Sequence, residues 1–123
     1  MNKVFRSRPF SRWMRRVGLT DEALLNAVRE MAQGLVDADL GGGVVKKRVT
    51  LPGRGKRAGA RTIVATRMAG RWFFLYGFEK NERANISTAE LKALQEYAKD
   101  LLELDAGQLA AIVSAGEMTE VVS

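Results

Sequence analysis

Lysine and arginine side chains dominate the chemistry that this sequence offers. Seven of them, with no acidic residue between them, occupy residues 46 to 61: Lys46, Lys47, Arg48, Arg54, Lys56, Arg57 and Arg61. Such a block is typical of a surface that neutralises phosphates, because each neutralised phosphate releases counterions and no base sequence has to be matched. We therefore expect a nucleic acid or an acidic protein as the partner. A basic surface that serves only solubility is the alternative.

The residue types that the chain lacks restrict catalysis. Its 123 residues include no His and no Cys, which excludes a Cys/His zinc site, a Ser-His-Asp triad and disulfides. Asp37 and Asp39 are too sparse for a metal site, and residues 53–56 lack the features of a P-loop. Arginines can still bind RNA and stabilise a phosphorane transition state when the 2′-hydroxyl of the RNA attacks. Lys, Glu or Tyr would then have to carry the proton.

The charge is distributed unevenly along the chain. Residues 1–85 hold 18 basic and 7 acidic side chains, whereas residues 86–123 hold 2 basic and 7 acidic ones. The length fits a single domain over residues 1–123, with residues 87–123 as a helical, acidic C-terminal extension that faces away from the basic residues. No apolar run approaches the length of a membrane span, so we expect a cytoplasmic protein without a membrane partner. An Arg-rich transit peptide at the N-terminus is the alternative.

Hydrophobic spacing and capping residues predict the elements that carry these charges. We expect a short strand over 1–6 and a helix over 7–17, with an apolar stripe opposite Arg12, Arg15 and Arg16. A second helix should run from an N-cap at Thr20 to Gly34. A strand over 44–51 and a basic loop over 52–59 follow, and then comes a hairpin of strands 61–68 and 71–78.

The C-terminal third reads as helical. Ser87 and Glu90 have the spacing of a capping box at the start of one helix, and a final helix over about 106–115 leads to an acidic tail. The fold class expected is α+β, with a small antiparallel sheet, N-terminal helices packed on one face and a C-terminal helix. Tyr97 falls in the apolar stripe of its helix, so we expect it to be buried.

Four segments together resemble the RelE/ParE superfamily of toxins from type II toxin-antitoxin systems, in particular its HigB-like, phage-derived branch. They are LTDE at 19–22, GLVDADLGGGVVKKR at 34–48, GARTI at 59–63 and FFLYGFEKNERANI at 73–86. The resemblance implies a RelE-like fold, with helices on one face of the sheet and a basic cleft on the other. It implies ribosome-dependent cleavage of mRNA by a metal-independent, 2′-hydroxyl-mediated reaction that inhibits translation and uses no cofactor. The implied partners are the ribosome and mRNA, a helix-turn-helix antitoxin, and operator DNA only through that antitoxin.

Carried over by position, the resemblance implies three catalytic residues: Arg61, Lys80 and Arg83. Arg61 and Arg83 would clamp the scissile phosphate, and Lys80 would be a proton carrier or a third cation. A salt bridge of Arg83 with Glu79, or of Lys80 with Glu82, is the structural alternative.

The surface that would contact RNA or the ribosome comprises Lys46, Lys47, Arg48, Arg54, Lys56, Arg57 and Phe78. Phe78 or Tyr76 could stack on a base, and the sheet core is the alternative place for both rings. Two other functions stay open: inhibition of gyrase, as in ParE-like toxins, and non-catalytic nucleic-acid binding.

Overall fold

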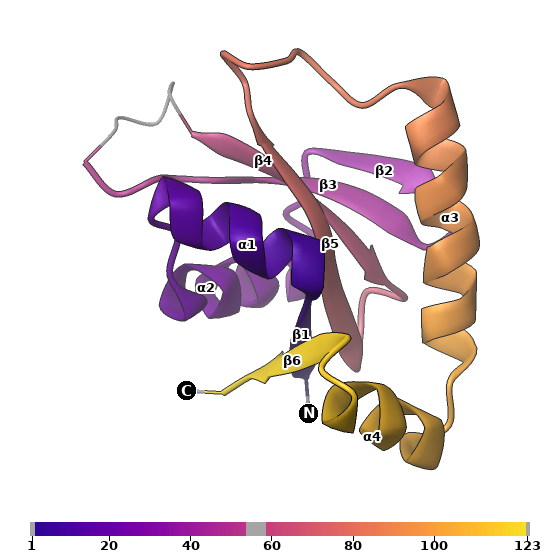
Figure 1. Ribbon diagram of the computed structural model, residues 1–123. Coiled ribbons are helices and arrows are strands. Elements are labelled where there is room, and N and C mark those ends of the chain that lie inside the picture. Colours follow the sequence, from indigo (N-terminus) through magenta and orange to yellow (C-terminus); the bar gives the residue numbers. More distant parts are fainter. Residues whose placement is uncertain (1, 54–58, 123) are drawn as a thin grey trace.

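The described residues, 2–53 and 59–122, form six strands and four helices in the computed structural model (Figure 1). Arg54, Lys56 and Arg57 of the predicted RNA surface lie outside them. No helix in the described ranges combines the length and the apolar composition that crossing a membrane requires. In chain order the elements are β1 (Lys3–Ser7), α1 (Arg8–Val17), α2 (Asp21–Ala32), β2 (Ala38–Gly41), β3 (Val44–Val49), β4 (Ala60–Thr66), β5 (Arg71–Glu79), α3 (Thr88–Glu103), α4 (Ala106–Ser114) and β6 (Met118–Val121).

All of these strands belong to one mostly antiparallel sheet with the order β2-β3-β4-β5-β1-β6. The predicted hairpin is confirmed as β4 and β5, and β3 pairs antiparallel with β4. β1 lies parallel to β5, and β6 pairs antiparallel with β1. The α+β fold class is therefore as predicted. The two edge strands were missed, because each spans only four residues and gains its pairing from a neighbour rather than from its own propensity.

Helices cover both faces of the sheet. On one face α1 and α2 pack through Phe10 and Leu24 against Trp72 and Phe74. α3 and α4 lie on the other face (Figure 1). They bury side chains such as Leu101 against the sheet. The N-terminal helices thus lie on one face, as predicted. The expectation of a C-terminal region turned away from the basic residues is wrong, because Arg67 and Arg71 bond the end of α3. The implied basic cleft has to share its face with α3 and α4, whose apolar side chains pack there. Tyr97, on α3, is 39% exposed rather than buried.

The predicted helix starts are confirmed by their caps. The Thr20 hydroxyl accepts a hydrogen bond from the backbone N–H of Ala23 at 3.2 Å. At the start of α3 the Ser87 hydroxyl accepts from the Glu90 N–H, and the Glu90 carboxylate accepts from the Ser87 N–H at 2.7 Å. Such reciprocal bonds satisfy two N–H groups that a helix end leaves without partners.

Arginines of the hairpin hold the other end of α3. The last turn of this helix contains no basic residue of its own. The Arg67 guanidinium donates to the carbonyl of Leu102 at 2.9 Å, and the Arg71 guanidinium donates to the carbonyl of Leu104. Cations near a helix C-terminus are favourable because the last carbonyls carry partial negative charge. The acidic helix is therefore fastened at this end to the basic hairpin.

A glycine lets α1 approach the end of β5. A Cβ atom added to Gly77 would lie 2.3 Å from the Trp13 ring, far inside van der Waals contact. Trp13 is buried and its ring lies 5.4 Å from that of Phe10, centroid to centroid. This close packing sets the position of the β5 segment that carries Tyr76 and Phe78.

Candidate nucleic-acid interface

Three basic side chains of β3 and β4 share the sheet face on which α3 lies. Arg48 is the cross-strand partner of Arg61, and Lys46 is that of Ile63. Directly paired residues point to the same face. Ile63 belongs to the core under α3, whereas its neighbours in alternation, Ala60 and Val64, belong to the core under α1 and α2. We call Lys46, Arg48 and Arg61 the basic row.

Among the described residues the side chains of the basic row form no salt bridge, although the backbone N–H of Arg48 donates to the carboxylate of Asp37. Arg48 and Arg61 lie directly opposite each other, an arrangement that is destabilising for like charges. Within the described ranges neither side chain forms a salt bridge, and the buried Nη1 of the half-buried Arg61 has no hydrogen-bond partner. A buried donor without a partner costs about 1–3 kcal/mol. A phosphate bound between the two arginines would relieve the repulsion, and it would bond the buried Nη1 only if the Arg61 side chain turned outward.

Lys47 faces the other way, which corrects its predicted role at an RNA surface. Only 9% of this residue is exposed. Its Nζ donates to the carbonyl of Leu35 at 3.0 Å and lies 2.9 Å from a carboxylate oxygen of Glu30 on α2. Strand alternation explains the difference, because neighbouring residues of a strand point to opposite faces. Lys47 stabilises the packing of α2 and leaves Lys46 and Arg48 to the exposed side.

The aromatic residues at the end of β5 belong mainly to the core. Phe78, the cross-strand partner of Arg61, is 3% exposed and lies in the core under α3. Its predicted stacking on a base is not available to a ring so buried, and the sheet core is where the structure places it. Tyr76 is half-buried, with its ring centroid 6.1 Å from that of Phe78. Tyr76 is the cross-strand partner of Ile63 and therefore lies beside the basic row. The register between β4 and β5 shifts immediately after Ile63.

Arg83 is engaged by Glu90 rather than by the predicted alternative, Glu79. The guanidinium donates to the two carboxylate oxygens at 2.5 and 2.9 Å, and it also donates to the Tyr76 hydroxyl at 3.2 Å. Its Nε donates to the carbonyl of Asn85, and its Cζ lies 5.9 Å from the centroid of the Phe78 ring. Hydrogen bonds to Glu90 and then to Tyr76 raise the pKa of Arg83 further above its ordinary value.

The sequence did not indicate that Glu90 would be the partner of Arg83. Its spacing from Ser87 announced a capping box, but nothing in the sequence linked it to Arg83 seven residues earlier. The Arg83 guanidinium, and then the Ser87 N–H, hold the pKa of Glu90 at about 2. With three of its nitrogen atoms hydrogen-bonded, Arg83 closes the connection between β5 and α3. It is therefore less available to a phosphate than Arg61.

Lys80 lies immediately beyond β5, two residues after Phe78, and is exposed. Among the described residues it has no ion pair, so the predicted alternative of a salt bridge with Glu82 is not formed. Lys80 and Tyr76 are titratable groups at the same end of β5 that can exchange a proton with a substrate. The described residues contain no group of three or more acidic side chains placed to hold a metal ion.

Comparison of the chain with models of known protein families identifies its family. A family model described as the RelE toxin of the RelE / RelB toxin-antitoxin system matches residues 2–121. The chain belongs to the RelE toxin family. No curated protein matches the sequence. Membership confirms the resemblance to RelE/ParE-superfamily toxins, and because the family is defined by toxin-antitoxin pairs it implies an antitoxin partner.

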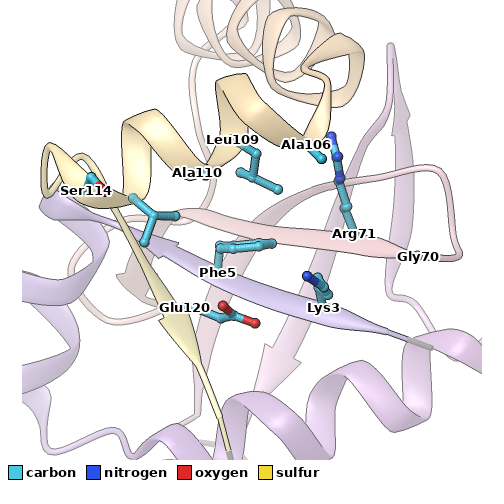
Figure 2. Close-up of a pocket in the computed structure, with 10 residues that line it drawn as sticks. Lys3, Phe5, Gly70, Arg71, Ala106, Leu109, Ala110, Ser114 and Glu120 are labelled. Carbon is cyan, nitrogen blue, oxygen red and sulfur yellow. The ribbon is translucent and has the colours of Figure 1, made fainter.

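This RelE-family toxin also has a pocket of about 540 Å³ at the opposite end of β5 from the basic row. Figure 2 shows Phe5 and Leu109 facing each other across it, with Lys3, Arg71 and Glu120 around them. Arg71 begins β5 and Phe78 lies near its end, so the length of the strand separates the pocket from Arg61. Neither Lys3 nor Glu120 forms a salt bridge within the described ranges. The pocket is thus a separate feature from the candidate interface.

Proposed function

We propose that this RelE-family toxin inhibits translation by cutting mRNA on the ribosome, with the basic row as its phosphate-binding surface. The observation that carries the proposal is the cross-strand pair Arg48 and Arg61, two arginines directly opposite each other on one sheet face that form no salt bridge among the described residues. An arginine fork matches the geometry of phosphate oxygens and stays charged at all working pH values. Such a pair binds the RNA backbone without regard to base sequence.

The chemistry proposed uses the 2′-hydroxyl of the RNA as nucleophile. Its oxygen bonds to the adjacent phosphorus while the bond from phosphorus to the 5′-oxygen breaks, leaving a 2′,3′-cyclic phosphate and a 5′-hydroxyl. Arg61 and Arg48 stabilise the extra negative charge that develops on the phosphorane oxygens. The proton of the 2′-hydroxyl has to leave and the 5′-oxygen has to gain one. We assign these two proton transfers to Lys80 and Tyr76.

We assign Arg83 a positioning role instead of a place in the phosphate clamp. Its hydrogen bonds to Glu90, Tyr76 and the Asn85 carbonyl fix the loop from which Lys80 projects. A side chain so engaged would have to give up its hydrogen bonds to reach a phosphate. Arg83 therefore acts through Tyr76 and the Lys80 segment.

Dependence on the ribosome follows from what the chain lacks. With no His in the sequence, no side chain has an unperturbed pKa near neutrality, so proton transfer is slow unless the substrate is well oriented. Holding the reacting groups in line lowers the barrier by several kcal/mol. The ribosome would supply that orientation to mRNA in the cytoplasm. A helix-turn-helix antitoxin would keep the toxin inactive and make the contacts to operator DNA.

Induction followed by primer extension on cellular mRNA tests the proposal. We expect new 5′ ends in translated mRNA, and we expect Arg61→Ala to abolish them. Arg29→Ala, which removes an exposed arginine of α2, is the matched control and should cleave normally. DNA damage with intact mRNA would instead indicate gyrase inhibition, and RNA binding without growth arrest would indicate a non-catalytic module. Either of these two results would overturn the proposal.

A further inference from the structure

The pocket at the start of β5 lies between the sheet and α4. On the sheet side it is lined by Lys3 and Phe5 of β1, Arg71 of β5 and Glu120 of β6, three neighbouring strands. On the opposite side it is covered by α4 (Figure 2). Its volume of about 540 Å³ falls in the range of about 300–1,000 Å³ that is typical of small-molecule sites. The proposed cleavage chemistry uses none of the residues that line it.

The pocket stays open because the side of α4 that faces the sheet carries largely short side chains. Those that line the pocket include Ala106, Ala110 and Ser114. Within α4 only Leu109 is buried, and its side chain faces Phe5 across the pocket (Figure 2). The Phe5 ring is stacked on that of Phe73, with 5.0 Å between the centroids. The apolar wall therefore belongs to the packed core and offers apolar surface that a ligand can cover.

Two cations lie side by side at one border of the pocket. Lys3 and Arg71 are cross-strand partners on β1 and β5. The Arg71 guanidinium donates through one terminal nitrogen to the carbonyl of Leu104, and its other terminal nitrogen has no hydrogen bond within the described ranges. The Lys3 ammonium has no salt bridge there. Two adjacent like charges with unused donors favour an anionic group between them.

An acidic side chain lies at another border of the pocket. Glu120 is the cross-strand partner of Phe5 and therefore the diagonal neighbour of Lys3. Diagonal neighbours in a sheet lie about 7–8 Å apart, within reach of long side chains. Figure 2 shows the charged ends of Lys3 and Glu120 turned toward each other, yet no salt bridge joins them within the described ranges. A ligand with both charges can lie between them.

We propose that this pocket binds a free α-amino acid with an apolar side chain. The carboxylate of the ligand accepts hydrogen bonds from Lys3 and Arg71, and its ammonium group donates to Glu120. Its side chain lies against Leu109 and Phe5. A simple anion would meet the carboxylate of Glu120, and a simple cation would meet two positive charges. A zwitterion has a partner for each of its charges, which lowers the cost of removing them from water.

Isothermal titration calorimetry on the purified full-length toxin, without RNA, tests the inference. The probes are L-leucine, L-phenylalanine, glycine, N-acetyl-L-leucine and N-acetyl-L-leucine amide. We expect leucine or phenylalanine to bind at least about tenfold more tightly than glycine, which has no apolar side chain. N-acetyl-L-leucine has lost the ammonium charge, and the amide has lost both charges. Each should bind at least about tenfold more weakly than leucine.

Charge-removing variants locate the binding in the pocket. Lys3→Gln and Glu120→Gln each remove one exposed charge, and each should weaken the binding of the amino acid about tenfold. The matched controls are Lys92→Gln and Glu96→Gln, which remove exposed charges of the same two signs from α3 and should bind like the parent. Thermal melting without ligand shows whether all four variants are folded.

Four results would overturn the inference. One is the absence of binding of both leucine and phenylalanine up to about 10 mM. Another is N-acetyl-L-leucine binding as tightly as leucine, which would make the pocket a site for simple amphipathic anions. Equal binding of the amide would assign it to an apolar side chain of a partner protein. Affinity unchanged in both Lys3→Gln and Glu120→Gln would place the amino acid elsewhere on the molecule. Because no RNA is present, these results leave the proposed cleavage unaffected.

Discussion

The Arg83 guanidinium and the Glu90 carboxylate form a two-bond pair, with N–O distances of 2.5 and 2.9 Å, across the connection between β5 and α3. The same carboxylate accepts the Ser87 N–H in the capping box of α3. One acidic side chain therefore both starts the helix and holds the loop that follows the basic hairpin. Removing its charge should affect the two together.

Stability should depend on the charge of Glu90 in acid. In the folded protein the pKa of Glu90 is lowered from 4.5 to about 2, chiefly by Arg83. A lowered pKa stabilises the fold above the unfolded value, and the contribution disappears as the pH falls through the folded value. We expect the difference in unfolding free energy between the parent and Glu90→Gln to be largest above about pH 4.5 and to shrink towards pH 2. Urea unfolding of both proteins across that pH range measures this difference. A difference in unfolding free energy that does not change with pH would contradict the prediction.

Arg83 and Arg61 should fail in different ways when truncated. Arg83→Ala removes the partner of Glu90 and should lower the melting temperature by a few degrees, while cleavage by the protein that stays folded is reduced through misplacement of Lys80. Arg83→Lys should restore little, because an ammonium group cannot make the two-bond contact. Arg61→Ala should abolish cleavage and leave the melting temperature at or above that of the parent, because it removes the repulsion with Arg48 and the donor without a partner. Melting curves measure the stability of each variant, and primer extension measures its cleavage activity. An Arg83→Ala variant as stable as the parent but inactive would show that Arg83 itself binds the phosphate.

Lys46 and Lys47 are adjacent in the sequence but should have different roles, Lys46 in RNA binding and Lys47 in the stability of the fold. Lys46→Ala should weaken RNA binding roughly fivefold at about 0.15 M salt and leave stability unchanged. Lys47→Ala should cost about 1 kcal/mol of unfolding free energy, from its hydrogen bond to Leu35 and the packing of its stem, and leave binding unchanged. Its pairing with the exposed Glu30 adds little. Anisotropy titrations and urea unfolding of both variants test the pair, and equal effects on binding would show that both lysines face the RNA.

The role of Lys80 can be separated into charge and proton transfer. Arg keeps the positive charge but does not lose a proton in proteins. If Lys80 carries a proton, Lys80→Arg should cleave as poorly as Lys80→Ala, with a loss of about 10²-fold or more in rate. A single-turnover cleavage assay on ribosome-bound mRNA gives the rate. Full activity of Lys80→Arg would show that Lys80 supplies only a third cation and leave Tyr76 as the proton donor.

Gly77 should tolerate no larger side chain. A Cβ atom would meet the Trp13 ring at 2.3 Å, so Gly77→Ala has to displace α1 from β5 and should destabilise the fold by about 1–3 kcal/mol. Gly107→Ala is the matched control, because its new Cβ would have ordinary contacts only, 3.5 Å from Asp105. Within helix α4 this second change should stabilise by up to about 1 kcal/mol. Urea unfolding that shows similar effects for the two glycines would contradict the packing described for Trp13.

Local signals predicted most of the elements because their causes act over a few residues. The cap at Thr20 and the Ser87–Glu90 box depend on hydrogen bonds within one turn, and the hairpin at 61–78 depends on a tight turn between two apolar strands. The edge strands β2 and β6 carry weak signals of their own. They form because β3 and β1 offer free backbone groups at the sheet edges.

By itself, the sequence determined the kinds of chemistry available: an acid-free basic segment, no histidine, and the strand and helix on which its charges lie. Only the tertiary structure decided which of these charges are usable. In the folded protein Lys47 pairs with Glu30 of α2, Arg83 pairs with Glu90, and Phe78 is buried against α3. Arg48 and Arg61 remain as cross-strand partners. The reason is physical: the face that a strand residue takes and the partner that a charge finds depend on which elements pack together, and those contacts join segments far apart in the chain.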